Sequence, residues 1–129
     1  PKQGVRQVLE TLRSNAISIV AMTGDNQYVA QKVVRDVGLP ADLVITGEGL
    51  LDETSFDGKV VGSVADYAVE HGTKMLTVVG GIDEYLDASL VARVNAHSLS
   101  AEHGRDESMQ RTMHCIEETV TRLLRASIK

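Results

Sequence analysis

Residues 42–79 read DLVITGEGLLDETSFDGKVVGSVADYAVEHGTKMLTVV, and this stretch decides the expected fold. It contains two short apolar segments, 42–46 and 74–79, whose β-branched residues and lack of alternation are typical of strands buried on both faces. Between them, 59–71 has the spacing of a helix, and Gly72 ends it. The apolar side of that helix consists of Val60, Val61, Val64, Ala65 and Ala68. A strand, a helix and a strand in this order predict a right-handed parallel crossover unit.

The rest of the chain continues this alternation. Its segments are assigned to helices over 4–14, 26–37 and 107–126, to a short helix or turn over 83–91, and to strands over 16–22 and 92–97. Asp106 is expected to cap the last helix. We therefore expect a single α/β domain over 1–129, with three α/β/α layers, a mainly parallel sheet of about four strands and a Rossmann-like arrangement.

The composition limits the partners that this chain can have. Its formal net charge is −5, which argues against a general nucleic-acid or anionic-membrane surface. The longest apolar stretches, about six residues, are too short to cross a bilayer, and the first residues lack the apolar core of a signal peptide. Cys115 is the single cysteine, so no internal disulfide can form and a cytoplasmic location is expected. The expected partner is a small-molecule substrate, and a homodimer could cover an open sheet edge.

Three of the expected strands end in glycine-bearing turns. These turns contain Gly24, then Gly47 with Gly49, and then Gly80 with Gly81. Ligands of open parallel sheets bind beyond the carboxyl ends of the strands, where glycines and helix N-termini favour anions. The three turns are therefore expected to lie on one ligand-binding edge.

Residues 46–59 carry most of the reactive side chains. The carboxylates suit Mg²⁺ coordination or general-base work on a hydroxyl, or else form a solvated acidic loop; they are Glu48, Asp52, Glu53 and Asp57. Thr54 and Ser55 are expected either to contact phosphate or to cap a turn. Lys59 opens the next helix, either holding a phosphate or lying on the surface.

Other reactive side chains give weaker signals. The four histidines share no metal-ligand spacing with one another or with Cys115, so no site for a protein-bound metal is predicted from them; they are His71, His97, His103 and His114. Cys115 lies beside the apolar stripe of the last helix and is expected to be inert core. Neither a Walker-type phosphate loop nor a dinucleotide-binding glycine fingerprint is present.

Residues 41–59, ADLVITGEGLLDETSFDGK, resemble the glycerate kinase motif DLVITGEG-R-(L/I)-D-x-Q-(S/T)-x-x-GK, and the resemblance continues to about residue 129. The positions that match are Gly47, Glu48, Gly49, Asp52, Ser55, Gly58 and Lys59. Leu50 replaces the motif's Arg, and Thr54 replaces its Gln.

This resemblance implies an ATP- and Mg²⁺-dependent phosphoryl transfer to a small hydroxy acid such as glycerate. It implies that Asp52 positions or deprotonates the hydroxyl or helps to hold the metal. The substrate or phosphate side would be served by Gly47, Glu48, Gly49, Ser55 and Lys59.

Residues 4–40, GVRQVLETLRSNAISIVAMTGDNQYVAQKVVRDVGLP, are similar instead to the phosphorylation-domain segment of P-type cation ATPases, which belong to the haloacid dehalogenase superfamily. By that resemblance Thr23 would hold a phosphoryl oxygen. The superfamily's nucleophilic Asp in a D-K-T-G-T run is absent, so phosphoaspartate chemistry is not expected.

Three functional interpretations remain open at this point. The first is a glycerate kinase-like domain that is incomplete or inactive alone, because a second lobe and two motif residues are missing. The second is a recombined or engineered chimera without catalytic function, joined near 39–42. The third is a small module that binds a phosphate ligand.

Overall fold

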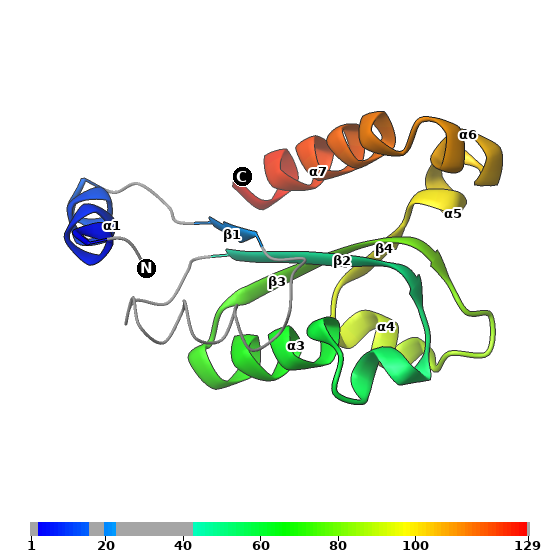
Figure 1. The fold of residues 1–129 in the computed structure, drawn as a ribbon, viewed down its shortest axis with the longest axis horizontal. Helices are drawn as coiled ribbons and strands as arrows, with labels where there is room; N and C mark the ends of the chain where they lie inside the picture. The colour runs from blue at the N-terminus through cyan, green and yellow to red at the C-terminus, as the bar shows by residue number, and fades with distance from the viewer. Residues whose placement is uncertain (1–2, 16–19, 23–42, 129) are drawn as a thin grey trace.

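The computed structural model of the chain describes residues 3–15, 20–22 and 43–128 (Figure 1). Its strands are β1 (Val20–Met22), β2 (Leu43–Leu51), β3 (Lys74–Ile82) and β4 (Ala96–Ser98). They form one sheet in the order β1-β2-β3-β4, and every neighbouring pair is parallel. The predicted α/β class and parallel sheet are confirmed. The predicted helix 26–37 and Thr23 lie outside the described residues.

Helices flank this sheet. They are α1 (Val5–Ser14), the short 3₁₀ helix η1 (Glu53–Phe56), α3 (Val60–His71), α4 (Ala88–Arg93), α5 (Leu99–His103), α6 (Arg105–Gln110) and α7 (Thr112–Ile128). The predictions over 4–14 and 59–71 agree with α1 and α3 to within one residue. Gly72 ends α3 in the left-handed conformation, at φ 63°, as its position in the sequence predicted.

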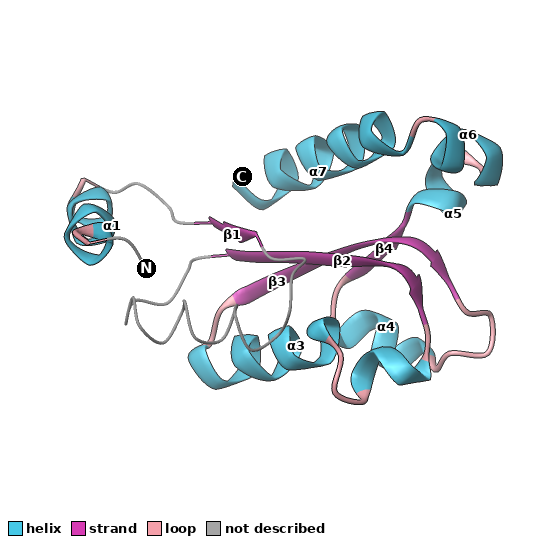
Figure 2. Ribbon diagram, in the orientation of Figure 1, coloured by secondary structure: helices cyan, strands magenta, loops and turns pink. Residues whose placement is uncertain are grey.

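The strand order explains where the helices lie. Right-handed crossovers that step along a sheet in one direction place their helices on the same face. Accordingly α3 and α4 lie on one face, whereas α7, with α5, covers the other (Figure 2). The pleat divides the apolar residues in the same way: Val44 belongs to the core under α3, and its neighbour Ile45 belongs to the core under α7.

The predicted last helix, 107–126, is interrupted. Arg111 leaves the helical region, with φ −125° and ψ 46°, and separates α6 from α7. The Thr112 hydroxyl donates to the carbonyl oxygens of Ser108 and Met109, at 2.6 and 3.2 Å, and so satisfies carbonyl groups at the end of α6. The cap of α6 is Gly104, not the predicted Asp106, which lies in the first turn of the helix.

Strands β2 and β3 are longer than predicted. They continue to Leu51 and Ile82, so Gly47, Gly49 and the pair Gly80–Gly81 lie inside paired strands instead of in turns. The physical reason is close backbone contact. A Cβ on Gly47 would collide with the carbonyl oxygen of Val78, and one on Gly80 would lie 2.6 Å from the carbonyl oxygen of Gly49. Gly47 and Gly80 are therefore explained by strand pairing.

Candidate functional site

The candidate site lies where β2 leaves the sheet. Leu51 is completely buried and ends the strand, and the amide of Asp83 donates to its carbonyl oxygen at 2.9 Å. This bond joins the carboxyl ends of the two central strands, β2 and β3. The turn from Asp52 to Lys59 follows and leads into α3. The structure thus brings Asp52, Ser55 and Lys59 into this turn.

Asp52 organises the turn. It is the N-cap of η1, its Oδ1 accepts from the Thr54 hydroxyl at 2.6 Å, and its own amide donates to Ser55 Oγ at 3.1 Å. The hydrogen bond from Thr54 lowers the pKa of the Asp52 carboxyl below its ordinary 3.8, and the nearby charge of Lys59 lowers it further. Asp52 is therefore a carboxylate at neutral pH, able to accept hydrogen bonds or bind a cation.

Ser55 and Thr54 act as capping residues in this turn. Ser55 is completely buried, and its hydroxyl lies 3.5 Å from Asp52 Oδ1. The turn packs closely on α3, since a Cβ on Gly62 would lie only 3.1 Å from the carbonyl oxygen of Ser55. Of the two roles that the sequence left open for these hydroxyls, turn capping is the one that the structure displays.

Lys59 is exposed at the first position before α3, where its extended backbone starts the helix without a side-chain cap. A cation opposes the helix dipole at this end. Its charge lies near Asp52, as the lowered pKa of that carboxyl reflects. An exposed cation and an ionised carboxylate thus belong to the same turn at the carboxyl end of the strands.

Two polar groups in β2 have no partner. The Oγ1 atom of Thr46, a residue only 4% exposed, and Oε1 of Glu48 are both closed to solvent and make no hydrogen bond within the described part of the chain. A buried polar atom without a partner costs about 1–3 kcal/mol, and more when it is charged. The sequence had singled out Glu48 but not Thr46, because a threonine in an apolar strand resembles an ordinary β-branched residue.

Gly49 differs from the other glycines of the two strands. A Cβ built on Gly49 would meet nothing within 4 Å, and the residue is exposed. No close packing explains this glycine, so an open approach to the backbone remains beside Glu48. The ligand-binding role that the sequence predicted for Gly49 therefore stays a prediction.

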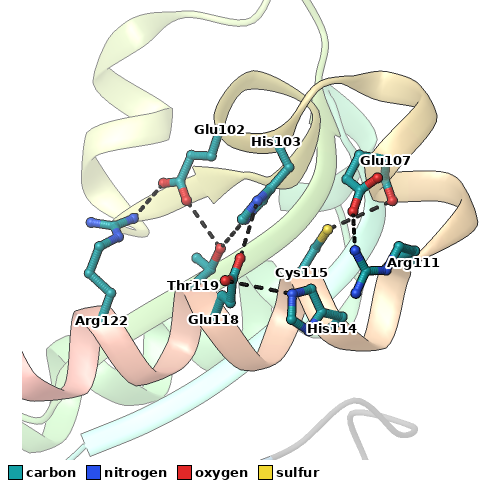
Figure 3. A network of polar contacts seen from close by, with 9 residues as sticks. All are labelled: Glu102, His103, Glu107, Arg111, His114, Cys115, Glu118, Thr119 and Arg122. Carbon is teal, nitrogen blue, oxygen red and sulfur yellow. Dashed lines mark hydrogen bonds and ion pairs between the residues drawn. The ribbon is translucent and has the colours of Figure 1, made fainter.

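A second polar cluster joins α5 to α7, and the sequence did not predict it (Figure 3). Glu102 accepts from Thr119 at 3.1 Å and from Arg122 at 2.8 Å. Burial raises the pKa of Glu102, but the bonds from Arg122 and Thr119 outweigh it, so the pKa lies below its ordinary value. His103 Nε2 lies 2.9 Å from the Thr119 hydroxyl. The contacts span 16 to 20 residues, which is why local spacing could not reveal them.

The histidines of this cluster surround a carboxylate. His103 Nδ1 lies 3.7 Å from Glu118 Oε2, and His114 Nε2 lies 3.6 Å from Glu118 Oε1. Within residues 3–15, 20–22 and 43–128, no three His, Cys, Asp or Glu side chains are grouped so that they could hold a metal ion. The cluster therefore consists of polar contacts that connect α5 to α7.

Cys115 is part of the core, as predicted. Its side chain is completely buried, and Sγ lies 3.7 Å from the carbonyl oxygen of Glu107. Burial raises the pKa of the thiol, and the charges of Glu107 and Glu118 add to that effect. A thiol with a raised pKa is a poor nucleophile.

The comparison with protein families agrees with the resemblance noted for residues 41–59. The model of the Glycerate kinase family matches residues 5–128, and the chain belongs to this family. The match includes both sides of the junction that the sequence suggested near 39–42.

Similarity to P-type ATPases is also present, but it is partial. The Magnesium-transporting ATPase, P-type 1, of Salmonella typhimurium is 41% identical over 56 residues, which are 41% of this chain and 6% of the transporter. The Probable copper-importing P-type ATPase A of Enterococcus hirae is 26% identical over 110 residues, 77% of this chain and 15% of that protein. The chain thus matches only a small part of each transporter. No solved structure matches it. Among the helices of the described ranges, none is long and apolar enough to cross a membrane.

Proposed function

We propose that this chain bears the reaction site of an enzyme that transfers a phosphoryl group from ATP, with Mg²⁺, to a small hydroxy acid such as glycerate. The proposal places this site on a three-layer, Rossmann-like domain in the cytoplasm, with a small molecule as substrate and with a homodimer as its assembly. Membership of the glycerate kinase family supports the reaction type. The observation that carries the proposal is the ionised Asp52, which Thr54 holds in the turn that ends at Lys59, at the carboxyl end of β2.

The residues of the turn fit the cofactors of this reaction. Mg²⁺ is usually held by one or two carboxylates together with phosphate oxygens, and Asp52 supplies a carboxylate that stays ionised. Lys59 supplies a positive charge for a phosphate at the start of α3. Bound Mg²⁺ would neutralise the charge of the transferred group, and phosphoryl transfer depends mainly on such positioning and neutralisation.

Asp52 would act on the substrate hydroxyl by orienting it and by accepting its proton late in the transfer. Its lowered pKa favours orientation and charge stabilisation over early proton removal. The two departures from the family motif affect this site differently. Thr54 supplies the hydroxyl that holds Asp52, whereas Leu50, 52% exposed near the end of β2, stands where the motif has a positive charge. We therefore expect weaker phosphate binding than a copy with Arg at this position would show.

A coupled assay of ADP formation tests the proposal. At high protein concentration, we expect turnover that requires ATP, Mg²⁺ and D-glycerate together. Asp52→Asn should lower kcat/KM roughly 100-fold, because Asn preserves the cap of η1 but removes the charge. Glu53→Gln is the matched control, since Glu53 is an exposed neighbour in the same turn, and it should leave kcat/KM unchanged. Absence of any D-glycerate-dependent turnover, or equal effects of the two variants, would refute the assignment.

A further inference from the structure

The outward face of α7 carries two charges that the rest of the fold does not use. Glu117 and Arg125 are exposed, and neither side chain makes a hydrogen bond or an ion pair within the described residues. By contrast, Arg122 of the same helix donates to Glu102 at 2.8 Å. Glu117 and Arg125 are therefore available to another molecule.

The helix cannot pair these two charges by itself. Partners on a helix surface lie three or four residues apart. At that spacing, no residue around Arg125 is acidic, and none around Glu117 is Lys or Arg. The two residues are about 12 Å apart along the axis, too far to reach one another. The helix dipole does not account for Glu117 either, because its effect is confined to the first turn and Glu117 lies in the second.

Thr121 lies midway between the two charges. Glu117, Thr121 and Arg125 follow one another at intervals of four residues, and all three are exposed. Such a row forms one ridge of a helix surface, and ridges of this kind pack against each other in the commonest class of helix contact. The row carries an acid at one end, a small side chain in the middle and a base at the other end.

This order makes the row complementary to itself when one copy is reversed. A twofold axis that passes beside Thr121 places Glu117 of each copy opposite Arg125 of the other copy, so that two equivalent ion pairs form. A parallel arrangement would place like charges opposite each other. The row therefore selects a second copy of this chain in the antiparallel orientation.

The surface beside the row is concave. A hollow of about 1090 Å³ is lined by residues of α5 and α7, and its lining includes the whole row. Glu102 and His103 bound it on the side of α5, from which their side chains reach toward α7 (Figure 3). A helix of a second copy would thus meet two helices instead of one, which increases the area that the contact can bury.

From this pattern we infer that the chain forms a twofold-symmetric dimer through the outward face of α7, with Glu117 of each copy paired to Arg125 of the other. The inference gives the proposed homodimer its interface, in place of pairing at an open sheet edge. It does not depend on the kinase reaction. Because the interface consists mainly of polar groups, the dimer is expected to be reversible.

Charge reversal tests the interface. In sedimentation velocity of the full chain without ligand, we expect the fraction of dimer to increase with protein concentration. Glu117→Arg and Arg125→Glu each place like charges opposite each other twice, so each variant should raise the dissociation constant at least about 10-fold. An equimolar mixture of the two variants should restore the dimer, because one copy then supplies both bases and the other both acids.

Glu70→Arg is the matched control. Glu70 is exposed on α3, which covers the opposite face of the sheet from α7, and the substitution changes the net charge as Glu117→Arg does. This variant should dimerise at least as well as the unaltered chain. Both substitutions make the net charge of −5 less negative, so a weaker dimer of Glu117→Arg alone cannot result from general repulsion.

The variants should remain folded, since neither Glu117 nor Arg125 has a partner in the described part of the chain. Recovery of the dimer on mixing shows this directly. Three results would each overturn the inference: a monomer at every concentration up to about 1 mM, a dimer that both reversals leave unchanged, or a mixture that stays monomeric. Turnover by a monomeric chain would leave the proposed reaction in place, and a dimer without turnover would leave the interface in place.

Discussion

Gly47 and Gly49 illustrate how residues of one type in one strand serve different needs. Gly47 faces the carbonyl oxygen of Val78 so closely that no side chain fits, whereas Gly49 has open space where a side chain would be. A glycine-rich motif can therefore combine a glycine that strand pairing requires with one that it does not require. The sequence alone showed the glycines but not which neighbour each one meets.

Alanine substitutions should separate these two glycines. Gly47→Ala must push β3 away from β2, and we expect it to lower the free energy of unfolding by about 2–3 kcal/mol. Gly49→Ala should change it by less than about 0.5 kcal/mol. Urea denaturation of both variants measures the difference. Equal destabilisation would show that Gly49, too, is required by strand pairing.

The lowered pKa of Asp52 predicts a pH dependence. Because the folded value lies below the ordinary 3.8, ionised Asp52 stabilises the turn at every pH above 3.8, and this contribution is lost as the pH falls through the folded pKa. Thr54→Val removes the strongest cause and should raise the pKa of Asp52 toward 3.8. Thr54→Ser retains a hydroxyl and should not.

Titration of the Asp52 carboxyl carbon by NMR measures these values directly. If the pKa of Asp52 were the same in Thr54→Val as in the unaltered chain, the 2.6 Å hydrogen bond from the Thr54 hydroxyl would not be what lowers it.

Among the elements, α7 depends on polar contacts as well as on apolar burial. Thr119 is 1% exposed, donates to Glu102 and lies within hydrogen-bond distance of His103. Because its single proton goes to Glu102, the Thr119 oxygen must accept from His103, which places a proton on Nε2 of that imidazole. One hydroxyl thus connects α5 to α7 through two hydrogen bonds.

Thr119→Val should remove both bonds while preserving the shape of the side chain. Since Glu102 and His103 would lose a partner in a partly buried setting, we expect a loss of about 1–3 kcal/mol in the free energy of unfolding. Thr121→Val, on the exposed side of the same helix, should change it by less than about 0.5 kcal/mol. Similar results for the two variants in urea denaturation would mean that this hydroxyl contributes nothing to the docking of α7.

The elements also show what can be predicted from sequence. Helix α3 was predictable because its apolar spacing and Gly72 act locally. The break at Arg111 was not, because it depends on hydroxyl bonds from Thr112 that compete with an otherwise helical pattern. The extension of β2 beyond Thr46 was missed because glycines were interpreted as turn residues, whereas in this sheet they permit two strands to approach.

The candidate site was predictable to a similar extent. Asp52 and Lys59 were expected to lie between a strand and a helix, where the family motif also has them, and the structure has them there. The orphaned hydroxyl of Thr46 was not found, since burial without a partner depends on neighbours from the whole sheet. The contacts of Glu102 with Thr119 and Arg122 were missed for the same reason.

At the scale of the whole molecule, the core under α7 should open only when the fold opens. Cys115 is completely buried there and its thiol pKa is raised, so we expect slow reaction with a thiol reagent at neutral pH and a rate that follows global unfolding. Thr121→Cys, exposed on the same helix, should react at once after Cys115→Ser removes the native thiol. Rapid reaction of Cys115 in the native chain would show that α7 detaches independently of the sheet.

The position of α7 also has a consequence for synthesis of the chain. Helices α3 and α4 are made between the strands that they cover, so one face of the sheet can close while translation proceeds. The other face, with Ile45, Leu76 and Val78, waits for α7, which emerges from the ribosome after every strand. Until then the nascent protein presents an open apolar surface, and a chaperone that shields such surfaces should raise its folding yield during translation more than during refolding of the finished chain.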